Sequence, residues 1–341
     1  MEMTLPQSIC IAVHDQSQVG EARREATLLA GKLGLDEETA GRLSIVVSEA
    51  ARNLSLHGGG GEIIVSSLDG RKQPCVELLA IDRGPGMDLQ KCIRDGYSTA
   101  GTPGTGLGAI TRLADAFDVH SAPGGTVLMA RFVSRRTPRH HHQESLDYSA
   151  TSVPFTGETL CGDAWAAVQT HSTNTFLVAD GLGHGQYAEE AAREAVRIFH
   201  HSNGASPSEI IDHAHGALRS TRGAALAIAR IDPHQQKLVF AGVGNISALV
   251  AVDGVSRNMV SLNGTVGHLM HRVQEFVYPW TNNAMLIMHS DGLGTRWDLK
   301  NYLGLAQRSP GVIAGVLYRD FSRQRDDVTV LVARCAQDQT P

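Results

Sequence analysis

The sequence has no excess of basic residues, and this absence excludes one class of protein. Its 341 residues contain 30 lysines and arginines against 35 aspartates and glutamates, so the net charge is −5. A protein that binds nucleic acid through its bulk charge needs a basic excess to neutralise the phosphate backbone. We therefore expect no nucleic-acid partner.

The sequence also lacks a long apolar run, although 42% of its residues are hydrophobic. No run reaches the length of about 20 residues that a membrane-spanning helix needs. The first residues, MEMTLPQ, lack the basic and apolar regions of a signal peptide. We therefore expect a cytoplasmic protein with no membrane partner.

Paired cysteines are absent as well. The five cysteines are scattered along the chain without a Cys-x-x-Cys pair, at Cys10, Cys75, Cys92, Cys161 and Cys335. This spacing indicates neither a disulfide framework nor a zinc ribbon.

What the sequence does contain is enough material for two domains, with a change of composition between them. The stretch SRRTPRHHHQESLDY has few apolar residues and no periodicity, and it is typical of a linker. We expect one domain at 1–134, a linker at 135–148 and a second domain at 149–341. The three histidines at 140–142 lack the rigid scaffold of a metal site.

The first domain has the pattern of a nucleotide-binding α/β domain. Its apolar spacing predicts helices over 16–33 and from Asp36 to about His57, with strands over 9–13, 62–68, 75–82, 117–121 and 126–133. Glu49 and Asn53 stand four residues apart on the second helix, so they share one face.

A nucleotide site needs a phosphate cradle, a residue that recognises the base and a magnesium ligand. Glycine-rich loops before a helix turn backbone N–H groups towards phosphate, and Gly104, Gly106 and Gly108 have this arrangement. Asp82 ends a strand and can accept a hydrogen bond from the exocyclic amine of adenine. Gly84 and Gly86 allow the base to lie close to the backbone. Asn53 offers a neutral oxygen to Mg²⁺, and Glu49 is placed as general base.

In the second domain, acidic residues follow apolar strands. The run Thr175–Asp180 delivers Asp180 and the Gly181 carbonyl to a strand end, where hard divalent metals find oxygen ligands. Three further acidic sites lie at strand ends or turns, at Asp163, Asp291 and the pair Asp326-Asp327. Folded into one sheet system, such edges can converge on an acidic pocket that two metal ions would neutralise.

Residues 4–133 resemble the histidine-kinase-like ATPase superfamily, and especially the anti-sigma-factor serine kinases of the stressosome switch type. The resemblance rests on SEAARN at 48–53, DRGPG at 82–86, GTGLG at 104–108 and Gly125-Thr126 before the last strand. It implies ATP with Mg²⁺ on Asn53, adenine held by Asp82 and Thr126, phosphates on the three loop glycines, and Glu49 as the base that activates a serine hydroxyl.

Residues 149–337 resemble the metal-dependent serine/threonine phosphatases of the SpoIIE and RsbX type. The motifs are GETLCGDAW at 157–165, VADGLGHG at 178–185, AGVGN at 241–245, HSDGLG at 289–294 and RDDVTVLVA at 325–333. The resemblance implies a β-sandwich flanked by helices, with two Mn²⁺ or Mg²⁺ ions held by Asp163, Asp180, Gly181, Asp291 and Asp326. Larger relatives have a histidine that acts as general acid directly after this Asp-Gly pair, Asp180-Gly181. This chain has Leu182 at that position, and His184 lies nearby.

Together the two resemblances imply a bifunctional enzyme, a serine/threonine kinase joined to a phosphatase that reverses its work. The expected substrates are anti-sigma-factor antagonists of the STAS class within a sigma-factor regulatory complex. In the alternative, the first domain uses ATP only to bind a partner, and the second domain alone is an enzyme. Glu49 favours the bifunctional enzyme, because a binding module needs no positioned base.

Overall fold

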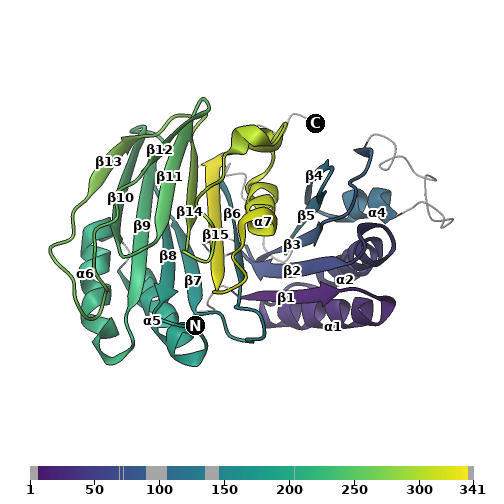
Figure 1. Ribbon diagram of the computed structural model, residues 1–341, viewed down its shortest axis with the longest axis horizontal. Coiled ribbons are helices and arrows are strands. Elements are labelled where there is room, and N and C mark those ends of the chain that lie inside the picture. The colour runs from purple at the N-terminus through teal and green to yellow at the C-terminus, as the bar shows by residue number, and fades with distance from the viewer. Residues whose placement is uncertain are drawn as a thin grey trace. The chain divides into compact units, whose positions relative to one another are not determined.

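The computed structural model describes residues 7–336, apart from 69, 72, 90–105, 135–145 and 203 (Figure 1). Gly104 and the three histidines at 140–142 lie outside the described residues. The chain forms two compact units. The N-terminal unit comprises Gln7–His141 with Asn301–Arg319, and the C-terminal unit comprises His142–Lys300 and the residues from Asp320 onwards.

The N-terminal unit contains one antiparallel sheet of five strands in the order β1-β2-β3-β5-β4. The strands are β1 (Ser8–Val13), β2 (Gly61–Ser67), β3 (Cys75–Asp82), β4 (Ala116–Ala122) and β5 (Gly125–Val133). Three helices pack on one face, namely α1 (Gln16–Lys32), α2 (Glu37–Asn53) and α4 (Gly106–Leu113). Their apolar side chains and the alternate residues of the strands form one core.

The helix ends follow from short polar residues in the sequence. Asp15 and Gln18 form a reciprocal capping box at the start of α1, and the Asp36 carboxylate accepts a hydrogen bond from the Thr39 amide at the start of α2. Between them Gly34 has a φ of 68°, a left-handed conformation that glycine adopts without strain. The predicted helix to His57 is α2 plus a π-helical turn, Leu54–Gly58.

The other face of this sheet is covered by α7 (Pro310–Phe321), a helix from far along the sequence. A Cβ atom added to Gly311 would lie 2.7 Å from Glu77 Oε1, and one added to Gly315 would lie 2.7 Å from Val127 Cγ1. The helix therefore approaches the sheet as closely as glycine allows. Because both faces of the sheet are covered, every residue of β3 is buried.

The C-terminal unit contains two antiparallel sheets of five strands each, with the orders β13-β10-β9-β8-β7 and β12-β11-β14-β15-β6. Its strands are β6 (Leu146–Val153), β7 (Asp163–Gln169), β8 (Asn174–Gly181), β9 (Ala224–Asp232), β10 (Lys237–Val243), β11 (Ser247–Val252), β12 (Val255–Asn258), β13 (Phe276–Pro279), β14 (Met285–His289) and β15 (Val328–Cys335). Helices α5 (Gln186–His201) and α6 (Pro207–Ala217) cover the first of these sheets. The expected fold class, mixed α and β with a sandwich of antiparallel sheets, is confirmed.

Three strands, β6, β12 and β13, differ from the sequence pattern. β6 begins at Leu146, within the stretch 135–148 expected as linker, because Leu146 and Tyr148 are buried and pair with β15. β12 and β13 have no local strand signal in the sequence: all four residues of β12 are exposed, and β13 has only four residues, of which the last is proline. Among the described residues, no helix is long and apolar enough to cross a membrane.

Candidate functional site

In the N-terminal unit, the end of α2 meets the start of α4. A Cβ atom added to Gly106 would lie 3.3 Å from Glu49 Oε2 and 3.6 Å from Asn53 Oδ1. The first residue of α4 therefore faces both polar side chains that the sequence places on one face of α2. A helix N-terminus beside a carboxylate and an amide oxygen is suited to a phosphate group and its cation.

Asp82, at the end of β3, is held by hydrogen bonds from the backbone. Its Oδ1 accepts hydrogen bonds from the amides of Gly84 (2.8 Å) and Thr126 (3.1 Å), and the residue is only 8% exposed. A carboxylate fixed by two backbone donors keeps one oxygen orientation, which a base-recognition group needs.

Thr126, whose amide bonds to Asp82, is held in turn by its own side chain. Thr126 Oγ1 lies 2.9 Å from Ser121 Oγ, which accepts a hydrogen bond from the Met87 amide. Gly86 has a φ of 78° and sits against the Ala122 carbonyl. Gly108 is buried inside α4. The N-terminal unit therefore contains two groups of predicted residues. One consists of Asp82, Gly84 and Thr126, and the other of Glu49, Asn53 and Gly106.

In the C-terminal unit, Asp163 and Asp180 are paired across neighbouring strands. They are direct partners in the β7–β8 register. Asp163 is 5% exposed, and its Oδ2 is buried without a hydrogen-bond partner. Burial, and then the negative charge of Asp180, raise the pKa of Asp163 well above its usual range. A buried carboxylate oxygen without a hydrogen-bond partner is suited to contact a divalent cation.

The other predicted acidic residues add their charge to this pair. Burial raises the pKa of Asp180 to about 7, with further contributions from Asp291, Asp326 and Asp327. Burial, and the charge of Asp291, also raise the pKa of Asp326. Mutual repulsion of this strength disfavours the ionised cluster unless a cation neutralises it.

The carboxylates of the described residues do not form a preassembled set of metal ligands. Among the described residues, no group of three or more His, Cys, Asp or Glu side chains is arranged to hold a metal ion. The chemistry of the donor set nevertheless fits hard divalent ions, because it consists of carboxylate oxygens and the backbone carbonyls at the strand ends. Gly181 lies at the end of β8, where its amide donates to the Gly162 carbonyl.

Asp327 has a different environment from its neighbour Asp326. Its Oδ1 accepts a hydrogen bond from the Phe155 amide at 2.8 Å. It therefore fixes the segment before β7, while Asp326 is more exposed and accepts a hydrogen bond from the Asp327 amide. The second oxygen of Asp327, Oδ2, is buried without a hydrogen-bond partner, as is Oδ2 of Asp163.

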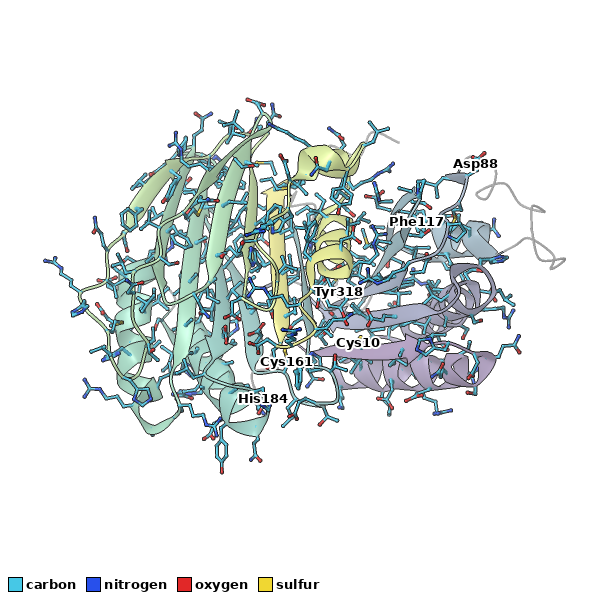
Figure 2. All side chains as sticks on the ribbon, in the orientation of Figure 1. Cys10, Asp88, Phe117, Cys161, His184 and Tyr318 are labelled. Atoms are coloured by element: carbon cyan, nitrogen blue, oxygen red, sulfur yellow. The ribbon has the colours of Figure 1, made fainter. Side chains whose placement is uncertain are left out.

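His184 lies on the loop after β8, where it interacts electrostatically with Asp326. Its Nδ1 lies 3.1 Å from Glu158 Oε1, and its side chain is 61% exposed. His184 is one of the residues labelled in Figure 2. Leu182 stands directly after Gly181, where larger relatives have a histidine, and the histidine of this loop is His184, two positions later.

Asn245 is a residue whose role the sequence did not reveal. Its Nδ2 donates to Asp291 Oδ2 at 2.7 Å. The motif AGVGN contains this asparagine, but the pattern alone does not indicate which ligand it orients. A neutral donor bound to a carboxylate oxygen leaves the other oxygen to face a cation.

We expect Asn245→Ala to weaken Mn²⁺ binding about tenfold or more, because Asp291 loses the hydrogen bond that orients it. Calorimetric titration of the metal measures this directly. Asn283→Ala is the matched control, since Asn283 makes a comparable bond of 3.0 Å to Asp253 on an exposed surface. Equal Mn²⁺ affinity in the Asn245→Ala variant and the wild type would rule out this role.

Comparison with known proteins gives two separate matches. The family model described as histidine kinase-like ATPase domain matches residues 12–132, and that of stage II sporulation protein E matches residues 171–336. The serine/threonine-protein kinase RsbT of Bacillus subtilis is 33% identical over 123 residues, which cover 36% of this chain and 92% of RsbT.

The second half has its own relatives. The phosphoserine phosphatase RsbX of Bacillus subtilis is 23% identical over 196 residues, covering 57% of this chain and 96% of RsbX. A crystal structure of RsbX in complex with magnesium has a TM-score of 0.50 at 20% identity, over 56% of this chain and 96% of that one. The chain is therefore a fusion: it belongs to the histidine kinase-like ATPases of the RsbT family through its N-terminal domain, and it carries a SpoIIE-type phosphatase domain after it.

Proposed function

We propose that this protein both phosphorylates and dephosphorylates serine or threonine residues of STAS-type anti-sigma-factor antagonists. The observation that carries the kinase half is the convergence of Glu49 and Asn53 on Gly106 at the start of α4. A domain that only bound nucleotide would need the cation ligand, but not a carboxylate at the phosphate end.

In the kinase reaction, Asn53 would hold Mg²⁺ on the nucleotide phosphates, and Asp82 with Thr126 would hold the adenine. The N–H groups of the loop that contains Gly104, and those at the start of α4, would bind the phosphate oxygens. Glu49 would accept the proton of the substrate hydroxyl as its oxygen attacks the γ-phosphorus and ADP leaves. The side chain of Glu49 also pairs with Arg52 at 3.4 Å, an exposed contact that leaves the carboxylate accessible.

In the phosphatase reaction, Asp163, Asp180, Asp291 and Asp326 with the Gly181 carbonyl would hold two Mn²⁺ or Mg²⁺ ions. When bound, such ions activate water and offset the charge that develops on the phosphoryl group. Asp180 is the central ligand, because it pairs with Asp163 and its pKa responds to the three other carboxylates. Asn245 orients Asp291, and Asp327 fixes the segment before β7.

The proposal is tested with labelled ATP and a STAS-domain protein, using the full chain with Asp180→Asn so that label is not removed. We expect label to accumulate on the STAS protein, and to be cleared when unmodified chain and Mn²⁺ are added. If nucleotide binds but no label is transferred, the N-terminal domain is the partner-binding module of the alternative hypothesis. If transferred label persists after the addition, the phosphatase half of the proposal fails.

A further inference from the structure

Within the C-terminal unit, the loop that follows β8 is tied to the turn that precedes β9. The two strands are neighbours, with Gly181 opposite Ala224 in their register (Figure 1). Beyond this pair, the Leu182 amide donates to the Gly223 carbonyl at 3.0 Å. The turn at 221–223 therefore lies beside the chain that follows the proposed metal ligands of β8.

This turn is held in place by its own hydrogen bonds. Thr221 Oγ1 donates to the Leu218 carbonyl at 2.8 Å and accepts a hydrogen bond from the Gly223 amide at 3.0 Å. Gly223 has a φ of 78°, and a Cβ atom added to it would lie 2.7 Å from the Val266 carbonyl oxygen. Arg222 stands between these two residues, so its side chain starts from a fixed backbone.

The side chain of Arg222 extends over the loop and the first turn of α5. Its guanidinium carbon lies 4.7 Å from the centroid of the Tyr187 ring, and a Cβ atom added to Gly183 would lie 3.1 Å from its Nη1. A guanidinium on the face of an aromatic ring is attracted to the ring and still has its N–H groups, which point outward in its own plane, available for a partner. The ring therefore positions a donor group without using its donors.

Arg222 has no acidic partner among the residues that the structure describes. In the same unit Arg193 pairs with Glu189 at 3.1 Å, and this described part of the chain offers no such carboxylate to Arg222. Both Arg222 and Tyr187 are exposed. A positive charge is therefore accessible beside a site whose own side chains are acidic.

The surface around Arg222 is partly apolar. Tyr187 is 59% exposed, and Leu182 is 42% exposed. Tyr187 faces the guanidinium, and Leu182 is bonded to the residue after Arg222. Apolar side chains that are exposed beside a charge, and continuous with a proposed catalytic site, suit a segment of protein better than a small ion. We call Leu182, Tyr187 and Arg222 the docking surface.

We infer that the docking surface binds an acidic segment of the phosphoprotein substrate, close to its phosphorylated serine or threonine. The inference rests on the proposed phosphatase function, which supplies the phosphorylated residue. A carboxylate of the substrate would accept hydrogen bonds from the N–H groups of Arg222, and an apolar side chain would contact Leu182 and the Tyr187 ring. The docking surface thus determines which substrate is bound, while the carboxylate site acts on the phosphoryl group.

The first test measures binding to the full chain with Asp180→Asn, so that phosphate is not removed. The probes are two synthetic phosphoserine peptides that differ only in the residues flanking the phosphoserine, which are glutamate in one and glutamine in the other. We expect calorimetry to show that the glutamate peptide binds about fivefold more tightly, because only its carboxylates form charge-assisted hydrogen bonds with Arg222.

Variants of the docking surface, made in the same Asp180→Asn chain, identify the residues responsible. Arg222→Gln should bind the two peptides with equal affinity. Tyr187→Ala should lose part of the preference, whereas Tyr187→Phe should keep it, because the ring face and not the hydroxyl holds the guanidinium. Arg219→Gln is the matched control, since Arg219 is an exposed arginine three positions earlier, and it should keep the full preference.

The second test compares substrates in the phosphatase reaction, using chains with intact Asp180 and Mn²⁺. With Arg222→Gln, kcat/KM for the glutamate peptide should fall about fivefold through a higher KM, while turnover of p-nitrophenyl phosphate should stay within about twofold of the wild type. An equal loss on both substrates would place Arg222 at the phosphoryl group, and the docking inference would be wrong.

The outcomes separate the inference from the function beneath it. If the wild type dephosphorylates both peptides but the Asp180→Asn chain binds them equally, the docking inference is overturned while the phosphatase function stands. If the preference for glutamate is unchanged in Arg222→Gln, it does not arise from the docking surface. If neither peptide nor p-nitrophenyl phosphate is hydrolysed with Mn²⁺, the proposed phosphatase function fails, and the inference fails with it.

Discussion

The Asp180→Asn exchange is expected to stabilise the metal-free protein and, in the same molecule, to abolish phosphatase turnover. The pKa of Asp180 is about 7 in the folded state against 3.8 for the free side chain. Between these values the folded chain holds a proton that the unfolded chain has lost. Stability of the metal-free protein must therefore fall as the pH rises from about 4 to 7, and asparagine removes this loss.

The size of the effect is considerable, because each pKa unit corresponds to about 1.4 kcal/mol. In chelator, the thermal unfolding temperature of the wild type should be markedly lower at pH 7.5 than at pH 5. The difference should be smaller for Asp180→Asn. Mn²⁺ should restore the wild type at pH 7.5 and have little effect on the variant. Turnover should fall at least about a thousandfold, equivalent to roughly 4 kcal/mol of transition-state stabilisation.

Asp212→Asn is the control for this comparison, since Asp212 is an exposed carboxylate on α6. It should alter neither the pH dependence nor the response to Mn²⁺. Full phosphatase activity in excess chelator would contradict the metal assignment. A variant at Asp180 that is less stable than the wild type in chelator at pH 7.5 would contradict the electrostatic account.

Asn53→Ala and Glu49→Gln should separate nucleotide binding from phosphoryl transfer. Asn53 is the proposed cation ligand, so its loss should weaken Mg²⁺-dependent nucleotide binding about tenfold or more. Glu49 is the proposed general base, and a base acts mainly in the transition state, so Glu49→Gln should keep the affinity while transfer falls about 10²- to 10⁴-fold. Calorimetry and transfer of labelled γ-phosphate measure the two effects.

Arg52→Ala serves as the control on the same helix. Its exposed ion pair with Glu49 is worth little, so both binding and transfer should stay within about twofold of the wild type. Equal loss of nucleotide affinity in the Asn53→Ala and Glu49→Gln variants would show that the two residues have the same role, against the proposal.

The sequence predicts the parts of this fold that have a strong local signal. Helix α2 begins directly after Asp36, in agreement with the predicted start, and Glu49 and Asn53 both face Gly106 from this helix. The partner of α7 was not predictable. Its residues from Pro310 to Arg319 are all buried, and apolar periodicity shows that a helix is buried without showing what covers it.

The same limit applies to the phosphatase site. Acidic residues at strand ends indicate where carboxylates gather, but the pairing of Asp163 with Asp180 depends on the β7–β8 register, which is set by contacts distant in sequence. The bond from Asn245 to Asp291 joins residues 46 positions apart and leaves no local pattern. β12 and β13 have only four residues each, and all four residues of β12 are exposed, so neither strand has a local signal in the sequence.

The central claim is that two opposed activities act on one residue of one substrate, and the most direct test uses the full chain with one half disabled at a time. The Asp180→Asn variant phosphorylates a STAS-domain protein, mass spectrometry maps the modified residue, and the Asn53→Ala variant is then added with Mn²⁺. The account predicts that the phosphate disappears from that same serine or threonine. A phosphosite that persists while the Asn53→Ala variant clears a different one would contradict it, and the two domains would then serve different partners.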